Sequence, residues 1–124
     1  MLQITAKYAH AWNTAWYGAP DERVREQLQA LEAALDAEGR NPKTLRRTVG
    51  IWVEDPDRVE PERSDPEAFR GSAEDLSVGL ESYERLGFDD AIVGLTPMSI
   101  QSLDRLASAR EAWLERTASP TRLG

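Results

Sequence analysis

Apolar residues recur at helical spacing in the segment 20–38. Its four apolar positions, separated by four, three and four residues, are Val24, Leu28, Leu31 and Leu35. Such a stripe covers one side of a helix with 3.6 residues per turn. Pro20, followed by two acidic residues, favours the start of this helix. Gly39 and the Asn41-Pro42 dipeptide predict its end.

Three further segments show the same period. The first helix is predicted at 2–9, with one side formed by Leu2, Ala6 and Ala9. Ser72 and Asp75 resemble a capping box, and the helix that they begin is expected to end at Gly87. Its apolar stripe consists of Leu76, Leu80, Tyr83 and Leu86. The buried side of a final helix is predicted to comprise Ile100, Leu103, Leu106, Ala107, Trp113 and Leu114.

Short apolar runs without helical spacing lie between these helices. Residues 45–53 end in VGIWV, and residues 90–95 read DAIVGL. Both runs are apolar at successive positions, which is typical of strands covered on both faces. Residues 10–13 are interpreted as a short strand, and residues 14–20, which end in Gly-Ala-Pro, as a loop.

A long polar segment occupies 54–71. It contains three prolines and many charges, which predict a solvated loop, too polar to pack and too often interrupted to be a helix. Its length leaves open whether it is an excursion over a functional face or a disordered segment. Residues 116–124 are predicted to be a flexible tail, so the folded domain is expected at 1–115.

Strands that alternate with amphipathic helices predict an α/β protein made of parallel βα units. Three strands and four helices fit a small open sheet or about half of a (β/α)8 TIM-type barrel, which usually has about 250 residues. The half-barrel is favoured because the chain opens on a helix without a preceding strand. The polar loop also follows the carboxyl end of a strand, where barrel enzymes build their pockets. Against it, three strands leave open edges that invite pairing with another chain.

The composition narrows the possible functions. The 124 residues, 40% of them hydrophobic, suffice for one packed domain. The formal net charge of -7 disfavours nucleic acid and anionic membranes as partners. Cysteine is absent and His10 is the single histidine, which excludes disulfides, thiolate chemistry and a multi-histidine metal site within one chain. No apolar run is long enough to span a membrane and no secretory signal is visible, so we expect a cytoplasmic protein.

Three segments contain motifs in a shared order of helix, turn and strand: LQITAKYAHAWN, LEAALDAEGRNPKTLRRTV and GSAEDLSVGLESYERLGFDDAIVGL. In order and spacing they resemble segments of the bacterial luciferase-like monooxygenase family. The first is similar to a helix leading into a strand that ends in Ala-Asp-x-Trp-Asn. The second is similar to a Gly-Arg-Asp/Asn-Pro turn before an Arg-Ser/Thr-Val strand. The third is similar to a Gly-Ser/Thr-Pro-Glu-Glu helix before a Gly-Phe/Val-Asp strand, and together they cover most of residues 2–114.

The resemblance implies a (β/α)8 oxidoreductase that uses reduced FMN or a deazaflavin coenzyme and acts on a small organic substrate. It also implies that the chain corresponds to the C-terminal half of such a barrel. The glycine-rich turn that helps to bind the cofactor phosphate, and much of the flavin bed, would precede Met1. We therefore expect little activity from the chain alone, and a partner in the form of an N-terminal half-barrel. The alternative is a non-enzymatic module that self-associates, for instance as a homodimer of half-barrels, or binds another protein.

Trp12 and Asn13 are the candidate cofactor-binding residues, because they are expected near the carboxyl end of a barrel strand. An indole packs on an isoalloxazine ring, and an amide hydrogen-bonds to its polar edge. In the alternative, Trp12 fills the core and Asn13 caps the next turn. His10 stands where the family motif has Asp, and no orienting carboxylate lies near it in the sequence. No catalytic residue and no metal ligand is assigned.

Other residues have a structural and a functional interpretation. Arg40 and Arg47 are candidate phosphate contacts, with turn and helix-end contacts as the alternative. Gly50 is expected to permit the close approach of a ligand or of a neighbouring backbone, while Trp52 and Trp113 are expected in the core. The loop carboxylates suggest an acid–base pair only by their number, and a solvated loop is the favoured interpretation.

Overall fold

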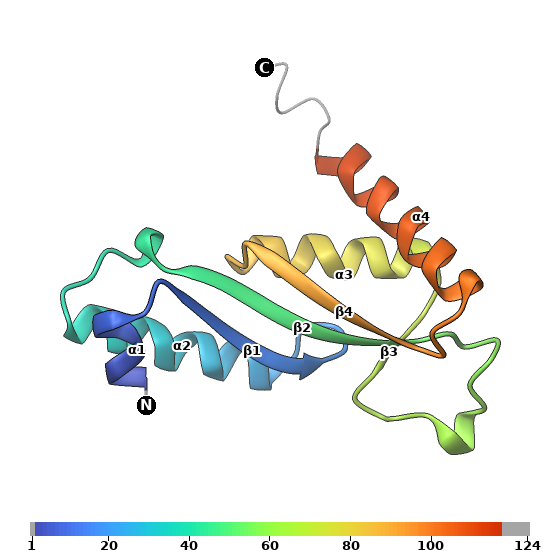
Figure 1. Cartoon of the computed structure of the whole chain (residues 1–124), viewed down its shortest axis with the longest axis horizontal. Coiled ribbons are helices and arrows are strands. Elements are labelled where there is room, and N and C mark those ends of the chain that lie inside the picture. Colours follow the sequence, from blue (N-terminus) through green and yellow to red (C-terminus); the bar gives the residue numbers. More distant parts are fainter. Residues whose placement is uncertain (1, 118–124) are drawn as a thin grey trace.

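The computed structural model describes residues 2–117, in which helices and strands alternate (Figure 1). The helices are α1 (Leu2–Tyr8), α2 (Glu22–Ala37), α3 (Ala73–Arg85) and α4 (Ile100–Thr117). The strands are β1 (Ala11–Tyr17), β2 (Arg46–Glu54), β3 (Phe69–Arg70) and β4 (Asp90–Thr96). Single turns of 3-10 helix occur at Pro42–Thr44 and Pro61–Arg63. No helix in this part of the chain combines the length and the apolar character needed to cross a membrane.

The strands form one parallel sheet with β2 at its centre. β4 pairs with one side of β2 from Thr48 to Glu54. β1 pairs with the other side as far as Ile51, and β3 takes its place beside Val53 and Glu54. The prediction of an α/β protein with parallel βα units is therefore confirmed.

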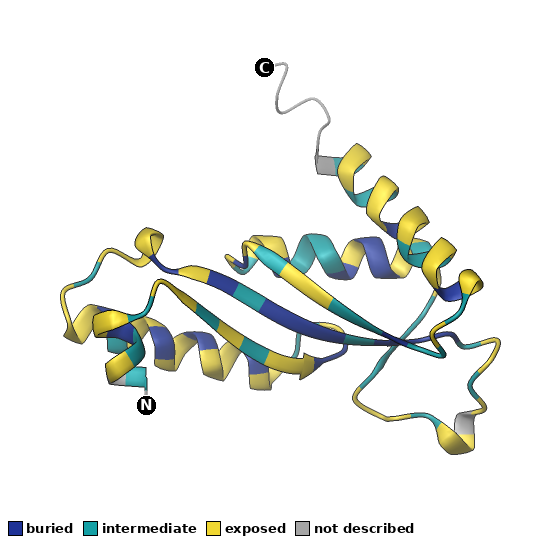
Figure 2. Cartoon of the chain, viewed as in Figure 1, coloured by how far each residue is buried: buried dark blue, intermediate teal, exposed yellow. Residues whose placement is uncertain are grey.

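One face of this sheet is covered by helices α2 and α3. Alternate side chains of β2 point to that face, because successive residues of a strand point to opposite sides. The cluster that they form with both helices includes Val24, Leu28, Val49, Ile51, Val53, Leu76 and Tyr83. A smaller cluster joins α1 to α2 and consists of Ala6, Leu31, Leu35 and Leu45. Figure 2 shows that buried residues concentrate along β2, whereas β1 and α4 are largely exposed.

The helix boundaries follow local signals in the sequence. Asp21 is the N-cap of α2, and its carboxylate accepts the backbone N–H of Val24 at 3.2 Å. Pro20 therefore lies outside the helix rather than in its first turn. Ser72 and Asp75 form the predicted capping box, with both hydrogen bonds at 3.1 Å. Gly39, after α2, adopts a left-handed conformation with φ of 66°.

The prediction of a loop at 14–20 is wrong for residues 14–17, which belong to β1, and agrees with the structure at residues 18–20. β1 continues to Tyr17, because Thr14 and Tyr17 pair with Val49 and Ile51 of β2, with an irregularity between them. The peptide bond between Ala15 and Trp16, within this irregularity, is cis. Pairing with β2 thus extends the strand as far as the turn signals that begin at Gly18.

The predicted buried side of the last helix is wrong in most positions. Leu106 and Trp113 are partly buried, but Ile100 is 74% exposed and Leu103 50% exposed. Between residues 100 and 116 of α4, the buried side chains are Ser102 and Ala109. The reason is that α4 packs on α3 instead of lying over β4, and Figure 1 shows it leading away from the sheet toward its C-terminal end. The strand before it is also less buried than predicted, since Ile92 is 56% exposed.

The long segment at 54–71 is mostly irregular, as predicted, but it is not simply solvated. Glu54 belongs to β2, and Glu54 and Asp55 are both buried. The segment also contains β3 and one 3-10 turn. Of the predicted tail at 116–124, the first two residues belong to α4 and the rest lies outside the described residues.

Candidate functional site

The uncovered face of the sheet carries a row of polar and aromatic side chains. The register places Asn13 of β1 beside Thr48 of β2, and Thr48 beside Asp90 of β4. In parallel strands, paired residues point to the same face. Further along this face, the register brings Trp52 beside Gly94. Helices α2 and α3 lie on the opposite side and leave this face uncovered.

Two glycines allow two tryptophans to lie close against this face. A Cβ on Gly94 would stand 2.5 Å from ring carbons of Trp52. A Cβ on Gly50 would stand 2.6 Å from the Cβ of Ala15 and 3.0 Å from the ring of Trp16. The two indoles meet edge to face, with centroids 5.8 Å apart and ring planes at 79°. The close approach predicted at Gly50 is therefore made by the neighbouring strand and its side chains.

An ion pair closes the amino end of this face. Arg46 donates to the two carboxylate oxygens of Asp90, from Nε at 2.5 Å and from Nη2 at 2.8 Å. The hydrogen bonds and the positive charge of Arg46 hold the pKa of Asp90 below its usual value. Both side chains are well exposed, so this pair adds little to stability.

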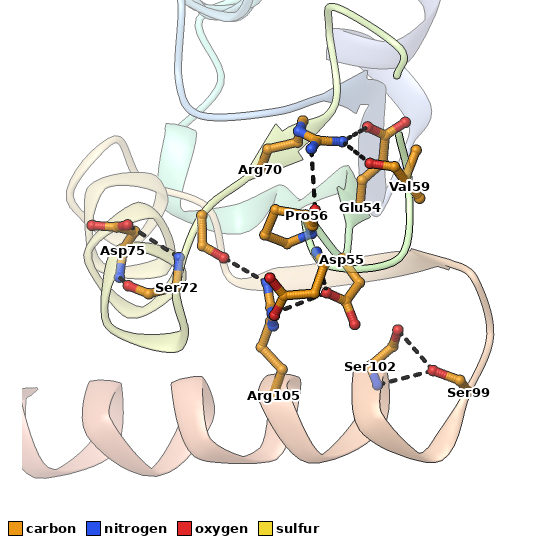
Figure 3. Close-up of polar contacts among 12 residues, drawn as sticks. Glu54, Asp55, Pro56, Val59, Arg70, Ser72, Asp75, Ser99, Ser102 and Arg105 are labelled. Atoms are coloured by element: carbon orange, nitrogen blue, oxygen red, sulfur yellow. Dashed lines mark hydrogen bonds and ion pairs between the residues drawn. The ribbon is translucent and has the colours of Figure 1, made fainter. Parts of the chain in front are cut away.

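The carboxyl ends of β2 and β3 carry a buried carboxylate, shown in Figure 3. Glu54 is 3% exposed. One of its oxygens accepts from Ser64 Oγ at 2.7 Å and from Arg70 Nη1 at 3.3 Å, and the other accepts from the backbone N–H of Asp65 at 2.9 Å. Burial raises the pKa of Glu54, but these hydrogen bonds outweigh burial and leave the pKa below its usual value.

Asp55 forms a second buried contact next to the first. Arg105 of α4 donates to Asp55 Oδ1 at 3.0 Å and to the carbonyl of Gly71 at 2.8 Å (Figure 3). The backbone N–H of Asp57 reaches the same carboxylate oxygen at 2.9 Å. Glu54 therefore holds the later part of the segment between β2 and α3 against the end of β2. Asp55, at the start of the segment, connects it to α4 through Arg105.

The predicted cofactor contacts are divided between the two faces of the sheet. Trp12 points to the helix side, where it packs against both core clusters and stacks on Phe88 with centroids 6.4 Å apart. This position agrees with the packing alternative for Trp12. Asn13 is exposed on the uncovered face and lies within β1, so it does not cap the following turn. Cofactor binding by Trp12 and Asn13 stays a prediction.

The arginines considered as phosphate contacts have structural partners. Arg40 donates to the backbone carbonyls of Thr5, Ala6 and Thr44. Arg47 is buried and forms an ion pair with Glu32 at 2.6 Å. His10 is exposed, and its carbonyl accepts the backbone N–H of Arg46. Among residues 2–117, no three acidic or histidine side chains are grouped in a way that would hold a metal ion.

The sequence interpretation missed the buried carboxylates and the tryptophan pair on the uncovered face, where Trp16 is exposed and Trp52, expected in the core, is partly buried. A signal for the first was present, because Glu54 and Asp55 directly follow the apolar run IWV at the carboxyl end of a strand. A signal for the second was the strict alternation of Gly50, Trp52 and Glu54, which places all three on one face.

Comparison with known proteins adds no assignment to this geometry. No protein-family model matches the chain, and the search of curated proteins gave no significant match.

Proposed function

We propose that the chain is one part of a flavin- or deazaflavin-dependent oxidoreductase of the luciferase-like kind. The observation that supports this proposal is the asymmetry of the parallel sheet. Helices cover one face. The other face carries Asn13 and Thr48 together with the tryptophan pair, Trp16 and Trp52. In a (β/α)8 barrel the helices lie outside and the inner strand residues face the lumen, with the reactive pocket at the carboxyl ends of the strands.

The residues on this face fit a flavin in part. The rings of Trp16 and Trp52 offer planar apolar surface, and Asn13 and Thr48 offer donors and acceptors. Arg40 and Arg47 bind other groups of the chain, a backbone carbonyl of α1 and the Glu32 carboxylate. These two arginines therefore do not form a binding site for the coenzyme phosphate. The coenzyme, when bound, would supply hydride transfer or oxygen activation. The chain would orient it, exclude water from one side, and hold the 54–71 segment at the rim through Glu54 and Asp55.

The DNA upstream of the Met1 codon provides the test. We expect it to encode, in frame or after a shift of frame, further βα units ending in a glycine-rich turn. Co-expression of that segment with the chain should give a complex that retains FMN or the deazaflavin coenzyme through gel filtration. The proposal fails if the encoded segment forms a stable complex with the chain and the complex binds neither coenzyme. It also fails if no such segment is encoded.

The second candidate is a self-associating module. The observation that favours it is that, within residues 2–117, β1 and β4 each pair with β2 on one side and with no strand on the other. Such edges readily accept another strand. Sedimentation equilibrium distinguishes the two candidates, because a chain that remains monomeric at high concentration is not a self-associating module.

A further inference from the structure

A cavity lies between α3, α4 and β4, on the helix side of the sheet. Its volume is about 360 Å³. It is lined mainly by apolar side chains, among them Val49, Leu80, Phe88, Val93, Leu106 and Trp113. It reaches the outer edge of β4, where no described strand pairs. The outer backbone edge of β4 therefore pairs with no described strand, and the β4 side chains on the helix side face the cavity.

The cavity exists because α4 is held by α3 and by the 54–71 segment rather than by β4. Near the C-terminal end of α4, Arg116 forms ion pairs with Glu74 and with Glu81 of α3. Near its start, Arg105 is fixed by Asp55 and by the carbonyl of Gly71. These contacts anchor both ends of the helix and leave the space beside β4 unfilled.

The same side of α4 continues into an exposed apolar stripe. Its residues, at spacings of three, four and seven, are Ile100, Leu103, Ala107 and Leu114. This spacing places them on one side of the helix. The acidic residues of the neighbouring row are Asp104, Glu111 and Glu115, all exposed and without an ion pair to another described residue. The stripe thus borders the cavity on one side and three carboxylates on the other.

We propose that this surface, the α4 docking surface, binds an amphipathic helix whose apolar stripe is flanked by lysine or arginine. It comprises the cavity and the exposed stripe of α4. The apolar part of the bound helix would cover Leu103 and fill the cavity, while its basic residues would face Glu111 and its acidic neighbours. The partner is a different segment and not α4 of a second copy, because the acidic row of a second α4 offers no positive charge to Asp104, Glu111 and Glu115, and an antiparallel pair would place both acidic rows on the same side. The inference does not depend on the coenzyme, so failure to bind flavin leaves it standing.

Three synthetic peptides as long as α4, 18 residues, test the proposal by fluorescence anisotropy with the whole chain. The first has a leucine stripe flanked by lysines, the second has glutamates in place of the lysines, and the third has the composition of the first in scrambled order. We expect the first to bind about tenfold more tightly than either of the others. Hydrogen exchange should show protection confined to α3, α4 and β4, the elements that line the cavity. Equal binding of the scrambled peptide, or protection elsewhere, would overturn the proposal.

Matched variants distinguish binding at the α4 docking surface from nonspecific attraction of a basic peptide to an acidic chain. Glu111→Lys should weaken binding of the lysine peptide about tenfold, whereas Glu26→Lys, an equal charge change at an exposed site of α2, should leave it unchanged. Leu103→Gln should weaken binding, whereas Val78→Gln, at an exposed apolar residue of α3, should not. Equal effects of the two lysine variants would overturn the proposal. So would a chain that sediments as a dimer and becomes monomeric in Leu103→Gln, because the occupant would then be a second copy.

Discussion

Glu54 connects the sheet to the segment that follows it by gathering three donors around one buried carboxylate. Its ionised form is stabilised by Arg70, by the Ser64 hydroxyl and by the backbone N–H of Asp65. A buried charge is costly unless it is paired and hydrogen-bonded. The contribution of Glu54 to stability therefore depends on its remaining ionised.

Glu54→Gln should lower the free energy of unfolding at neutral pH by about 1–3 kcal/mol, because Arg70 and Asp65 lose a charged acceptor. The sign of the pH dependence follows from the lowered pKa of Glu54. Its stabilisation is complete above the unfolded value near 4.5 and is lost as the pH falls through the lower folded value. Urea unfolding between neutral and acidic pH measures this, with Glu62→Gln on the exposed loop as the control. An unchanged midpoint at neutral pH would contradict the prediction.

Gly50 and Gly94 should differ in their tolerance of alanine. At Gly50 the added Cβ meets the Cβ of Ala15 at 2.6 Å, which cannot move without shifting β1. At Gly94 it meets the ring of Trp52, which can turn toward the uncovered face. We expect Gly50→Ala to destabilise the chain by about 1–3 kcal/mol and Gly94→Ala by less. Thermal unfolding measures both, and the reverse order would show that Trp52 is fixed in place.

At the scale of elements, α4 differs most from its sequence pattern. Its apolar stripe predicted burial against the sheet, but ion pairs of Arg105 and Arg116 turn a different side inward. Long-range ion pairs of this kind leave no periodic signal in a sequence. By contrast, α2 and α3 were predicted well because Asp21, Ser72 and Gly39 act locally through caps and a left-handed turn.

Arg105→Ala should release the start of α4 and leave Asp55 buried without its cation. Removing one partner of a buried pair is strongly destabilising, by about 3 kcal/mol. We expect faster hydrogen exchange in the first turns of α4 and in the 54–71 segment, with β1 unaffected. Arg110→Ala is the control, because Arg110 is exposed and forms no ion pair with a described residue. Equal exchange in the two variants would show that α3, and not Arg105, holds α4.

The arrangement of the candidate site also depends on long-range contacts that leave no periodic signal in the sequence. The alternation along β2 contained the information that Gly50 and Trp52 share a face, but which face the helices cover depends on how whole βα units pack. The position of Trp12 on the helix side, and the continuation of β1 through Tyr17, both follow from pairing with β2. Such pairing joins segments more than thirty residues apart, which is why local pattern did not show it.

At the scale of the whole molecule, one sheet face is packed and the other is exposed. Parallel sheets normally have both faces covered, so the uncovered face and the outer edge of β4 are surfaces on which further structure can be built. The proposed oxidoreductase uses the uncovered face for its coenzyme, and the α4 docking surface lies on the opposite, helix-covered side. The two surfaces can therefore be tested separately in the same chain.

The chain alone should not bind a flavin tightly. Trp16 is 48% exposed, so a ring stacked on this face would be open to water on its outer side. Titration of the chain with FMN and with the deazaflavin coenzyme, followed by coenzyme fluorescence, should show no saturation at about 1 µM, where tight binding would appear. The Trp52→Ala variant identifies the site if saturation is seen. Binding that is tight in the wild type and lost in Trp52→Ala would contradict this prediction, since the four-stranded sheet and the 54–71 segment would then suffice to bind a flavin.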